Sequence, residues 1–193
     1  MSENQNPPLT VGVVGTGRLG GRHAHFAAGH PDVCLKAVAD TRAQVGRAIA
    51  RETDATWYAD YKTMLKKEDL DLVIVATPDP LHRDPVVAAA RAGVPHIITE
   101  KPMATSRTDA RRMRDTVQKA GTDLYILFPN RFDPLDRAVR YAVQNGLVGE
   151  PAYGDVRLDD NISVPTTMWG SRSRAWASGS SSAHFLLSHV VDL

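Results

Sequence analysis

Short apolar runs recur along the first 128 residues, and segments with helical periodicity separate each run from the next. The clearest runs are TVGVV (10–14), CLKAVA (34–39), LVIVA (72–76), HIIT (96–99) and LYILF (124–128). Near-continuous apolar strands of this kind are buried on both faces, which is typical of a parallel sheet covered by helices. The alternation therefore predicts an α/β fold with a doubly wound parallel sheet.

Helices are expected in the segments between these runs, over residues 22–28, 43–52, 85–92 and 108–120, with a shorter amphipathic piece at 60–67. Thr41 and Ser106 (or Thr105) are the expected N-caps of the second and the last of the four. Pro85 is expected at the first position of its helix, where the missing N–H group costs nothing.

The pattern changes after Phe128. One further helix is expected over residues 134–145, and residues 161–182 are an irregular segment rich in Ser, Arg, Thr and Gly. The last eleven residues, AHFLLSHVVDL, are apolar and helical in pattern but have no capping residue after them. These features predict one domain over residues 1–129 and the beginning of a second over residues 130–193, in a truncated chain.

Composition excludes several classes of protein. A formal net charge of +1 gives no electrostatic basis for binding nucleic acid. Cys34 is the only cysteine, so neither a disulfide nor a thiolate metal site is expected, and the spacing of His23 and His25 places them on different faces of a helix, which argues against a metal pair. With no leader and no apolar window long enough for a membrane, the sequence is expected to be cytoplasmic.

The first apolar run is followed directly by GTGRLG, residues 15–20, which places Gly15, Gly17 and Gly20 in a G-x-G-x-x-G pattern around Arg18 and Leu19. Between a strand and a helix, such glycines permit a tight turn, close approach of a pyrophosphate, and close packing of helix on strand. The alternative is a glycine-rich turn without a ligand. An acidic residue at the end of the next strand, Asp40, favours dinucleotide binding.

Asp40 also bears on which dinucleotide would bind. Its carboxylate can accept hydrogen bonds from the adenosine ribose hydroxyls and would repel a 2′-phosphate, which favours NAD over NADP. Arg42 weakens this preference, because a guanidinium there could pair with a 2′-phosphate or stack on adenine. An exposed helix-start arginine with neither role is an equal alternative.

Charged and polar residues follow two later strands at the same edge of the sheet: Thr77-Pro78 after one, and Glu100-Lys101 after the other. Ligands of open parallel sheets bind outside the carboxyl ends of the strands. Lys101 is therefore placed either to face the cofactor crevice or to lie in a surface loop, and spacing alone leaves the two readings even.

Three motifs, GTGRLGGRHA, ATPDPLH and EKPMA, in this order and at these distances, resemble the glucose–fructose oxidoreductase / inositol dehydrogenase / MocA (Gfo/Idh/MocA) family. The resemblance implies an NAD(P)-binding Rossmann domain followed by a second domain with an open, mainly antiparallel sheet. It also implies that Lys101 lies near the substrate hydroxyl and the nicotinamide, and that His82 belongs to the cofactor site. Asp79 stands where the family more commonly has Asn.

The family's later motif falls on residues 179–192, where the resemblance makes His189 the acid/base histidine. The carboxylate usually found four residues before it is Phe185 here, which puts the orientation of His189 in doubt. The predicted catalytic residues are thus Lys101 and His189.

The predicted function is hydride transfer between a nicotinamide cofactor and a secondary alcohol of a sugar, polyol or related substrate. Two alternatives stay open: an NAD-dependent glycosidase of the same fold, and a non-catalytic dinucleotide-binding regulator. A homo-oligomer is expected for the longer protein. The chain alone is expected to turn over weakly or not at all.

Overall fold

The computed structural model describes residues 7–153 of the 193-residue chain. The chain separates into two compact units, Met1–Ile126 and Leu127–Leu193. The expected irregular segment at 161–182 and the expected helical C-terminus lie outside the described residues. Within the described residues, no helix has both the length and the apolar character needed to cross a membrane.

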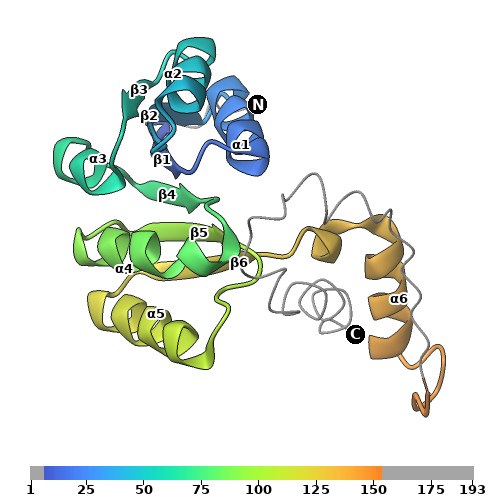
Figure 1. The fold of residues 1–193 in the computed structure, drawn as a ribbon. Coiled ribbons are helices and arrows are strands. Elements are labelled where there is room, and N and C mark those ends of the chain that lie inside the picture. Colours follow the sequence, from blue (N-terminus) through green and yellow to red (C-terminus); the bar gives the residue numbers. More distant parts are fainter. Residues whose placement is uncertain (1–6, 154–193) are drawn as a thin grey trace. The chain divides into compact units, whose positions relative to one another are not determined.

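The first unit alternates strands and helices (Figure 1). Its strands are β1 (Leu9–Val14), β2 (Val33–Ala39), β3 (Thr56–Tyr58), β4 (Leu72–Val75), β5 (His96–Glu100) and β6 (Asp123–Leu127, whose last residue begins the second unit). Its helices are α1 (Arg18–Gly29), α2 (Ala43–Glu52), α3 (Tyr61–Lys67), α4 (Arg83–Arg91) and α5 (Arg107–Ala120).

The strands form one sheet in the order β3-β2-β1-β4-β5-β6. The pairs β1–β2, β1–β4, β2–β3 and β4–β5 are all parallel. The order reverses between β1 and β4, because the chain builds outward from β1 in one direction and then returns to build in the other. This sheet confirms the predicted doubly wound α/β fold, and it has the strand order of a Rossmann domain.

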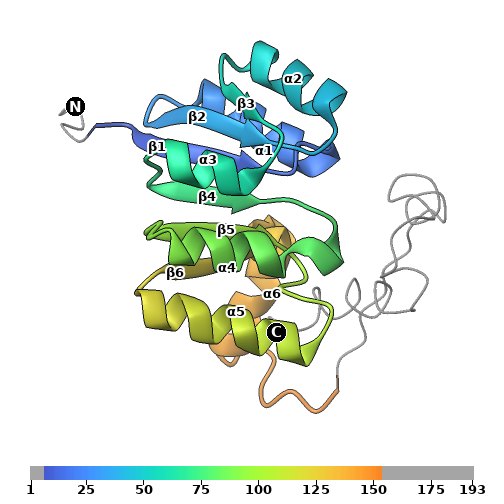
Figure 2. The same cartoon turned by 60° about the vertical axis from the view of Figure 1, so that its left-hand side comes forward.

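Helices cover both faces of the sheet, and Figure 2 shows α3, α4 and α5 in front of the strands. On that face, Met64, Val86 and Val117 of these helices belong to one buried apolar cluster. On the opposite face, Ala24 of α1 and Ala50 of α2 belong to a second cluster. Each fully buried Val or Met side chain contributes roughly 1.5–3 kcal/mol, so the two clusters hold the strand ends in place.

Helix starts differ from the sequence-based expectations more than helix ends do. The helix after the glycine turn, α1, begins at Arg18 rather than at residue 22. Helix α4 begins at Arg83 rather than at Pro85, so Pro85 is its third residue. Thr41 is not the cap of α2: Arg42 occupies the N-cap position and makes no side-chain capping bond. Ser106 caps α5 as expected, accepting a hydrogen bond from the Asp109 N–H group.

One strand has no counterpart in the predictions. β3 is only three residues long, and it pairs with the end of β2 at the sheet edge. Its side chains are only partly buried, so its apolar pattern is too short and too mixed to stand out from a loop.

The second unit contributes one described helix, α6 (Pro134–Gln144), close to the expected 134–145. Asp133 caps it by accepting a hydrogen bond from the Leu135 N–H group, and Gly146 follows with a φ of 70°. That this unit is the start of a substrate domain stays a prediction.

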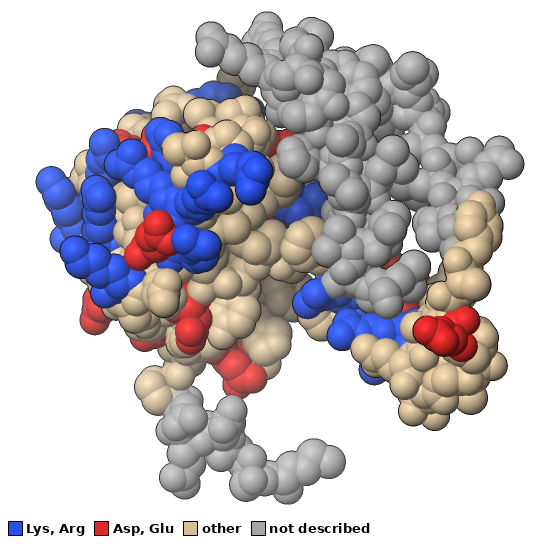
Figure 3. All heavy atoms as spheres, turned by 90° about the horizontal axis from the view of Figure 1, so that it is seen from below, with Lys and Arg blue, Asp and Glu red and all other residues tan. Residues whose placement is uncertain are grey.

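The arginines of α5 are surface residues of the first unit. Arg107, Arg111, Arg112 and Arg114 are all exposed. In the view from below, many Lys and Arg side chains gather on part of the surface of the first unit (Figure 3). The exposure of the four arginines agrees with the expectation that the basic residues of this helix form its solvated face.

Candidate cofactor site

The register of the sheet brings the carboxyl ends of four strands level. Val14 is opposite Ala39 on one side and Val75 on the other, and Val75 is opposite Thr99. The residues that come next in the chain therefore lie along one edge of the sheet. These are Gly15 after β1, Asp40 after β2, Ala76 and Thr77 after β4, and Glu100 and Lys101 at the end of β5.

Two glycines of the turn after β1 are required by close backbone packing. Gly15 has a φ of +85°, and a Cβ there would meet the Ala76 carbonyl oxygen at 2.8 Å. A Cβ on Gly20 would lie 1.7 Å from the Gly15 carbonyl oxygen, so the first turn of α1 rests directly on the turn that precedes it. Neither contact can relax by side-chain rotation, because both partners are backbone atoms.

Gly17 differs from Gly15 and Gly20, because the position that its Cβ would take is not blocked by backbone atoms of the described residues. It is the N-cap residue of α1 and makes no side-chain capping bond. Among residues 7–153, a Cβ there would have one neighbour within 4 Å beyond the adjoining residues, Nη2 of Arg42 at 3.5 Å. The first turn of a helix presents N–H groups without partners in the helix, together with the positive end of the helix dipole. The residues present thus fit a pyrophosphate group, which would take the position that a Cβ would block.

Arg18 and Leu19 form the exposed start of α1 beside this turn. Leu19 is 42% exposed, as several other large apolar side chains of the described residues also are. Their position agrees with their prediction as cofactor-site residues, and their contact with a cofactor stays a prediction.

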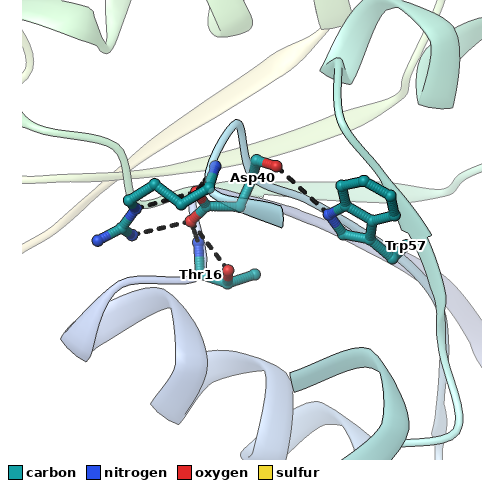
Figure 4. A network of polar contacts seen from close by, with 4 residues as sticks. Thr16, Asp40 and Trp57 are labelled. Atoms are coloured by element: carbon teal, nitrogen blue, oxygen red, sulfur yellow. Dashed lines mark hydrogen bonds and ion pairs between the residues drawn. The ribbon is translucent and has the colours of Figure 1, made fainter. Parts of the chain in front are cut away.

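Asp40 lies buried across the mouth of the glycine turn, between Thr16 and Trp57 (Figure 4). Its Oδ2 atom accepts hydrogen bonds from the Thr16 N–H at 2.8 Å and the Thr16 hydroxyl at 2.9 Å. The indole N–H of Trp57 donates to the Asp40 backbone carbonyl at 3.3 Å. Asp40 is thus part of the structure of the turn as well as a candidate ribose ligand.

Arg42 completes the surroundings of this carboxylate. Its backbone N–H donates to Oδ1 of Asp40 at 2.8 Å, its Nε donates to Oδ1 at 3.1 Å, and its Nη2 donates to Oδ2 at 2.9 Å. The Arg42 side chain remains 60% exposed, whereas that of Asp40 is 5% exposed. A flexible surface cation therefore covers a buried anion.

Opposing effects act on the pKa of Asp40. Burial by itself raises the pKa, but hydrogen bonds from Arg42 and Thr16 outweigh it and hold the pKa below the usual value of an aspartate. Because the folded-state pKa is depressed, the ionised Asp40 carboxylate stabilises the folded chain, and this stabilisation is fully present above the unfolded-state pKa. It is lost as the pH falls through the folded-state pKa.

We expect Asp40→Asn to lower the free energy of unfolding at pH 7 by about 2 kcal/mol, because an amide NH₂ would face donors that need an acceptor. The difference from the parent chain should begin to shrink as the pH falls below about 4, the unfolded-state pKa of an aspartate, and should go on shrinking as the pH falls through the lower folded-state pKa of Asp40. Urea unfolding at a series of pH values measures this difference. Asp69→Asn, at an exposed position, is the matched control and should change little at any pH. If the difference in free energy of unfolding between the parent chain and Asp40→Asn stayed constant down to low pH, the stabilising role of the ionised Asp40 carboxylate would be contradicted.

His82 ties together the loops that follow β4 and β5. It is fully buried, with Nε2 2.9 Å from the Thr77 carbonyl oxygen and Nδ1 2.8 Å from the Pro102 carbonyl oxygen. His82 therefore links the Thr77-Pro78 and Lys101-Pro102 segments. That His82 belongs to a cofactor site stays a prediction. The Lys101–Pro102 peptide bond is cis.

Glu100 has a partner that sequence reasoning missed. It is buried at the end of β5, and its Oε1 lies 2.9 Å from Nε2 of His23 in α1. This contact joins the segment before Lys101 to α1, the helix that follows the glycine turn. Lys101 itself is half-buried at the carboxyl edge of the sheet, and the structure leaves its side-chain role a prediction.

The structure thus groups the predicted residues in two places along one sheet edge. Gly15, Gly17, Gly20, Asp40 and Arg42 form the first group, and Thr77, Pro78, His82, Glu100 and Lys101 form the second. His189 and Phe185 lie outside the described residues. The hydroxyl group of Thr77, buried at this edge, has no hydrogen-bond partner within the described part of the chain.

Thr16, His23 and Trp57 are the site residues that the sequence analysis missed. Thr16 lies inside the glycine motif at a position that the motif leaves variable. The contacts of His23 with Glu100 and of Trp57 with Asp40 span 77 and 17 positions. Periodicity carries no signal for such distant contacts.

Among curated relatives, the chain is 35% identical over 147 residues to an inositol 2-dehydrogenase of Rubrobacter xylanophilus, covering 74% of this chain and 42% of the relative. It is 35% identical over 166 residues to a 2,7-anhydro-N-acetylneuraminate hydratase of Mediterraneibacter gnavus, covering 83% of this chain and 43% of the relative. The chain thus spans less than half the length of these relatives.

A solved structure of similar fold is the WlbA dehydrogenase of Bordetella pertussis in complex with NADH and UDP-GlcNAcA. It superimposes with a TM-score of 0.70 at 31% sequence identity, covering 74% of this chain and 43% of that one. A family model described as an oxidoreductase family with an NAD-binding Rossmann fold matches residues 9–128. That match confirms the resemblance seen in the motifs: the chain belongs to the Gfo/Idh/MocA oxidoreductase family.

Proposed function

We propose that this chain is the cofactor-binding part of an NAD(P)-dependent oxidoreductase that acts on a secondary alcohol of a sugar, polyol or related substrate. The observation that carries the proposal is the open position at Gly17, beside buried Asp40 and at the start of α1. A turn packed this closely at Gly15 and Gly20 but left open at Gly17 has the shape that a pyrophosphate needs.

Bound nicotinamide would supply the hydride chemistry, and the residues of the chain would orient the reactants and move the proton. We assign Lys101 to the reacting hydroxyl, where its ammonium group can donate a hydrogen bond to the alcohol or carbonyl oxygen. His82 and Glu100 hold the two loops on either side of it. By family resemblance, His189 exchanges the proton with the substrate hydroxyl.

The relatives support the proposed substrate class. The Rubrobacter protein is named an inositol 2-dehydrogenase, and the Bordetella structure is a complex with NADH and UDP-GlcNAcA. NAD is the proposed cofactor, with NADP second, since Asp40 has the type and place of a ribose-binding carboxylate. The longer protein is proposed to act as a cytoplasmic homo-oligomer.

A second candidate is a reaction without net oxidation, in which a bound cofactor is reduced and reoxidised in one cycle. The relative named a hydratase favours it, because its name describes no net redox change. The glycosidase alternative belongs to the same class. Product formation without a matching amount of free NADH distinguishes this candidate from a dehydrogenase.

The first test is a fluorescence titration of the chain with NADH and, separately, with NADPH. Binding by the folded chain supports the proposal, and no binding of either contradicts it. The second test uses the protein with its complete second domain and follows absorbance at the NADH band across a panel of polyols and sugars. In the same assay, the present chain alone should show little or no turnover.

A further inference from the structure

The acceptor that would hold the adenosine ribose is already occupied by the protein. The Asp40 carboxylate receives five donor contacts, two from Thr16 and three from Arg42. An ionised carboxylate offers about four lone-pair sites. A ribose hydroxyl therefore cannot reach Asp40 unless one of the present donors leaves.

Only one donor group can leave without disturbing the fold. The contacts from the Thr16 N–H and the Arg42 N–H come from the backbone of the two turns, and the Thr16 side chain is buried. The Arg42 guanidinium is the exception, because its side chain is 60% exposed and can rotate into solvent. It also lies at the mouth of the phosphate turn, with Nη2 3.5 Å from the point where a Cβ on Gly17 would be.

The two cofactors should respond to this guanidinium in opposite ways. NADH must displace it from Asp40 to use the carboxylate, so the ion pair competes with NADH. NADPH carries a 2′-phosphate that a guanidinium can bind through two parallel hydrogen bonds, and the same cation offsets the charge of Asp40.

We propose that Arg42 is the residue that determines cofactor specificity, competing with NADH for Asp40 and admitting NADPH as an alternative cofactor. This inference rests on the proposed dinucleotide-binding function. It predicts that the parent chain discriminates weakly, with dissociation constants for NADH and NADPH within about tenfold of each other, although the acidic residue alone would predict strong preference for NAD.

The test is a titration of the parent chain, Arg42→Ala and Arg51→Ala with NADH and with NADPH at one fixed ionic strength. Arg51 is an exposed arginine near the other end of α2, so its removal controls for the general loss of a positive charge. Arg42→Ala should bind NADH about 3- to 10-fold more tightly and NADPH at least 10-fold more weakly, whereas Arg51→Ala should match the parent.

Weaker binding of both cofactors by Arg42→Ala, to a similar degree, would overturn the proposal and indicate that Arg42 stacks on the adenine. An unchanged ratio of the two dissociation constants would also overturn it. In both cases the parent chain still binds, so the proposed function would survive. Absence of binding by the parent chain would instead remove the proposed function and this inference together.

Discussion

Gly20→Ala is expected to destabilise the first unit by about 4 kcal/mol or more, which is a large part of the stability of a typical domain. The added Cβ would lie 1.7 Å from the Gly15 carbonyl oxygen and 2.8 Å from its carbonyl carbon. Relief would require α1 to move away from β1, and that movement would separate Ala24 and Ala27 from the apolar cluster they share with Val11 and Val13. Urea unfolding followed by circular dichroism measures the loss.

Gly29→Ala is the matched control for this prediction. Gly29 is the last residue of the same helix, and in the part of the chain that the structure describes no other segment lies within 4 Å of the position that its Cβ would take. The control should therefore unfold within about 0.5 kcal/mol of the parent chain. If Gly20→Ala unfolded at the same urea concentration as Gly29→Ala, that result would contradict the close packing of α1 against the glycine turn.

Lys101→Met is expected to reduce kcat by about 10³-fold in the proposed longer protein with a substrate domain, because the group that would assist proton movement at the hydroxyl is removed. The dissociation constant for NADH should stay within about threefold, since the phosphate turn and Asp40 are unchanged. Steady-state kinetics and NADH titration on the same preparation measure the two effects. Lys119→Met, at an exposed position near the end of α5, is the control for loss of a lysine.

Lys101→Arg separates two roles of this residue. An arginine keeps the positive charge but does not deprotonate in proteins. If Lys101 exchanges a proton, the arginine variant should be nearly as impaired as the methionine variant, whereas a purely electrostatic role would leave much of the activity. Activity near the parent level in Lys101→Met would contradict the assignment of Lys101 to the reacting hydroxyl.

Those features that depend on neighbouring residues were predictable from the sequence. The strands β1, β2, β4 and β5 show as apolar runs because most of their residues are buried. β6 shows as an apolar run although none of its residues is fully buried. The glycine motif locates the phosphate turn because close backbone packing admits no side chain at Gly15 and Gly20. The family resemblance then identifies Lys101 and His82 from short motifs around them.

Features that depend on particular contacts in the folded chain were not predictable. Helix propensity alone disfavours a start of α1 at Arg18, because the first turn then contains Gly20 and Gly21. The close packing of Gly20 against the preceding turn is visible only in the structure. The pairing of His23 with Glu100 needs α1 and β5 to be placed first. Likewise, the sequence suggested both Asp40 and Arg42 as ligands but not that the two bind each other, which changes what each can offer to a cofactor.

The central claim is that the turn at residues 15–20 binds the pyrophosphate of a dinucleotide, and NADH titration of Gly17→Ala tests it most directly. The backbone at Gly17 has a φ of −64°, which alanine adopts freely, and within the described residues the added methyl group contacts the end of the exposed Arg42 side chain. The variant should therefore unfold within about 1 kcal/mol of the parent while binding NADH at least 10-fold more weakly. A folded Gly17→Ala chain that bound NADH as tightly as the parent would contradict the claim.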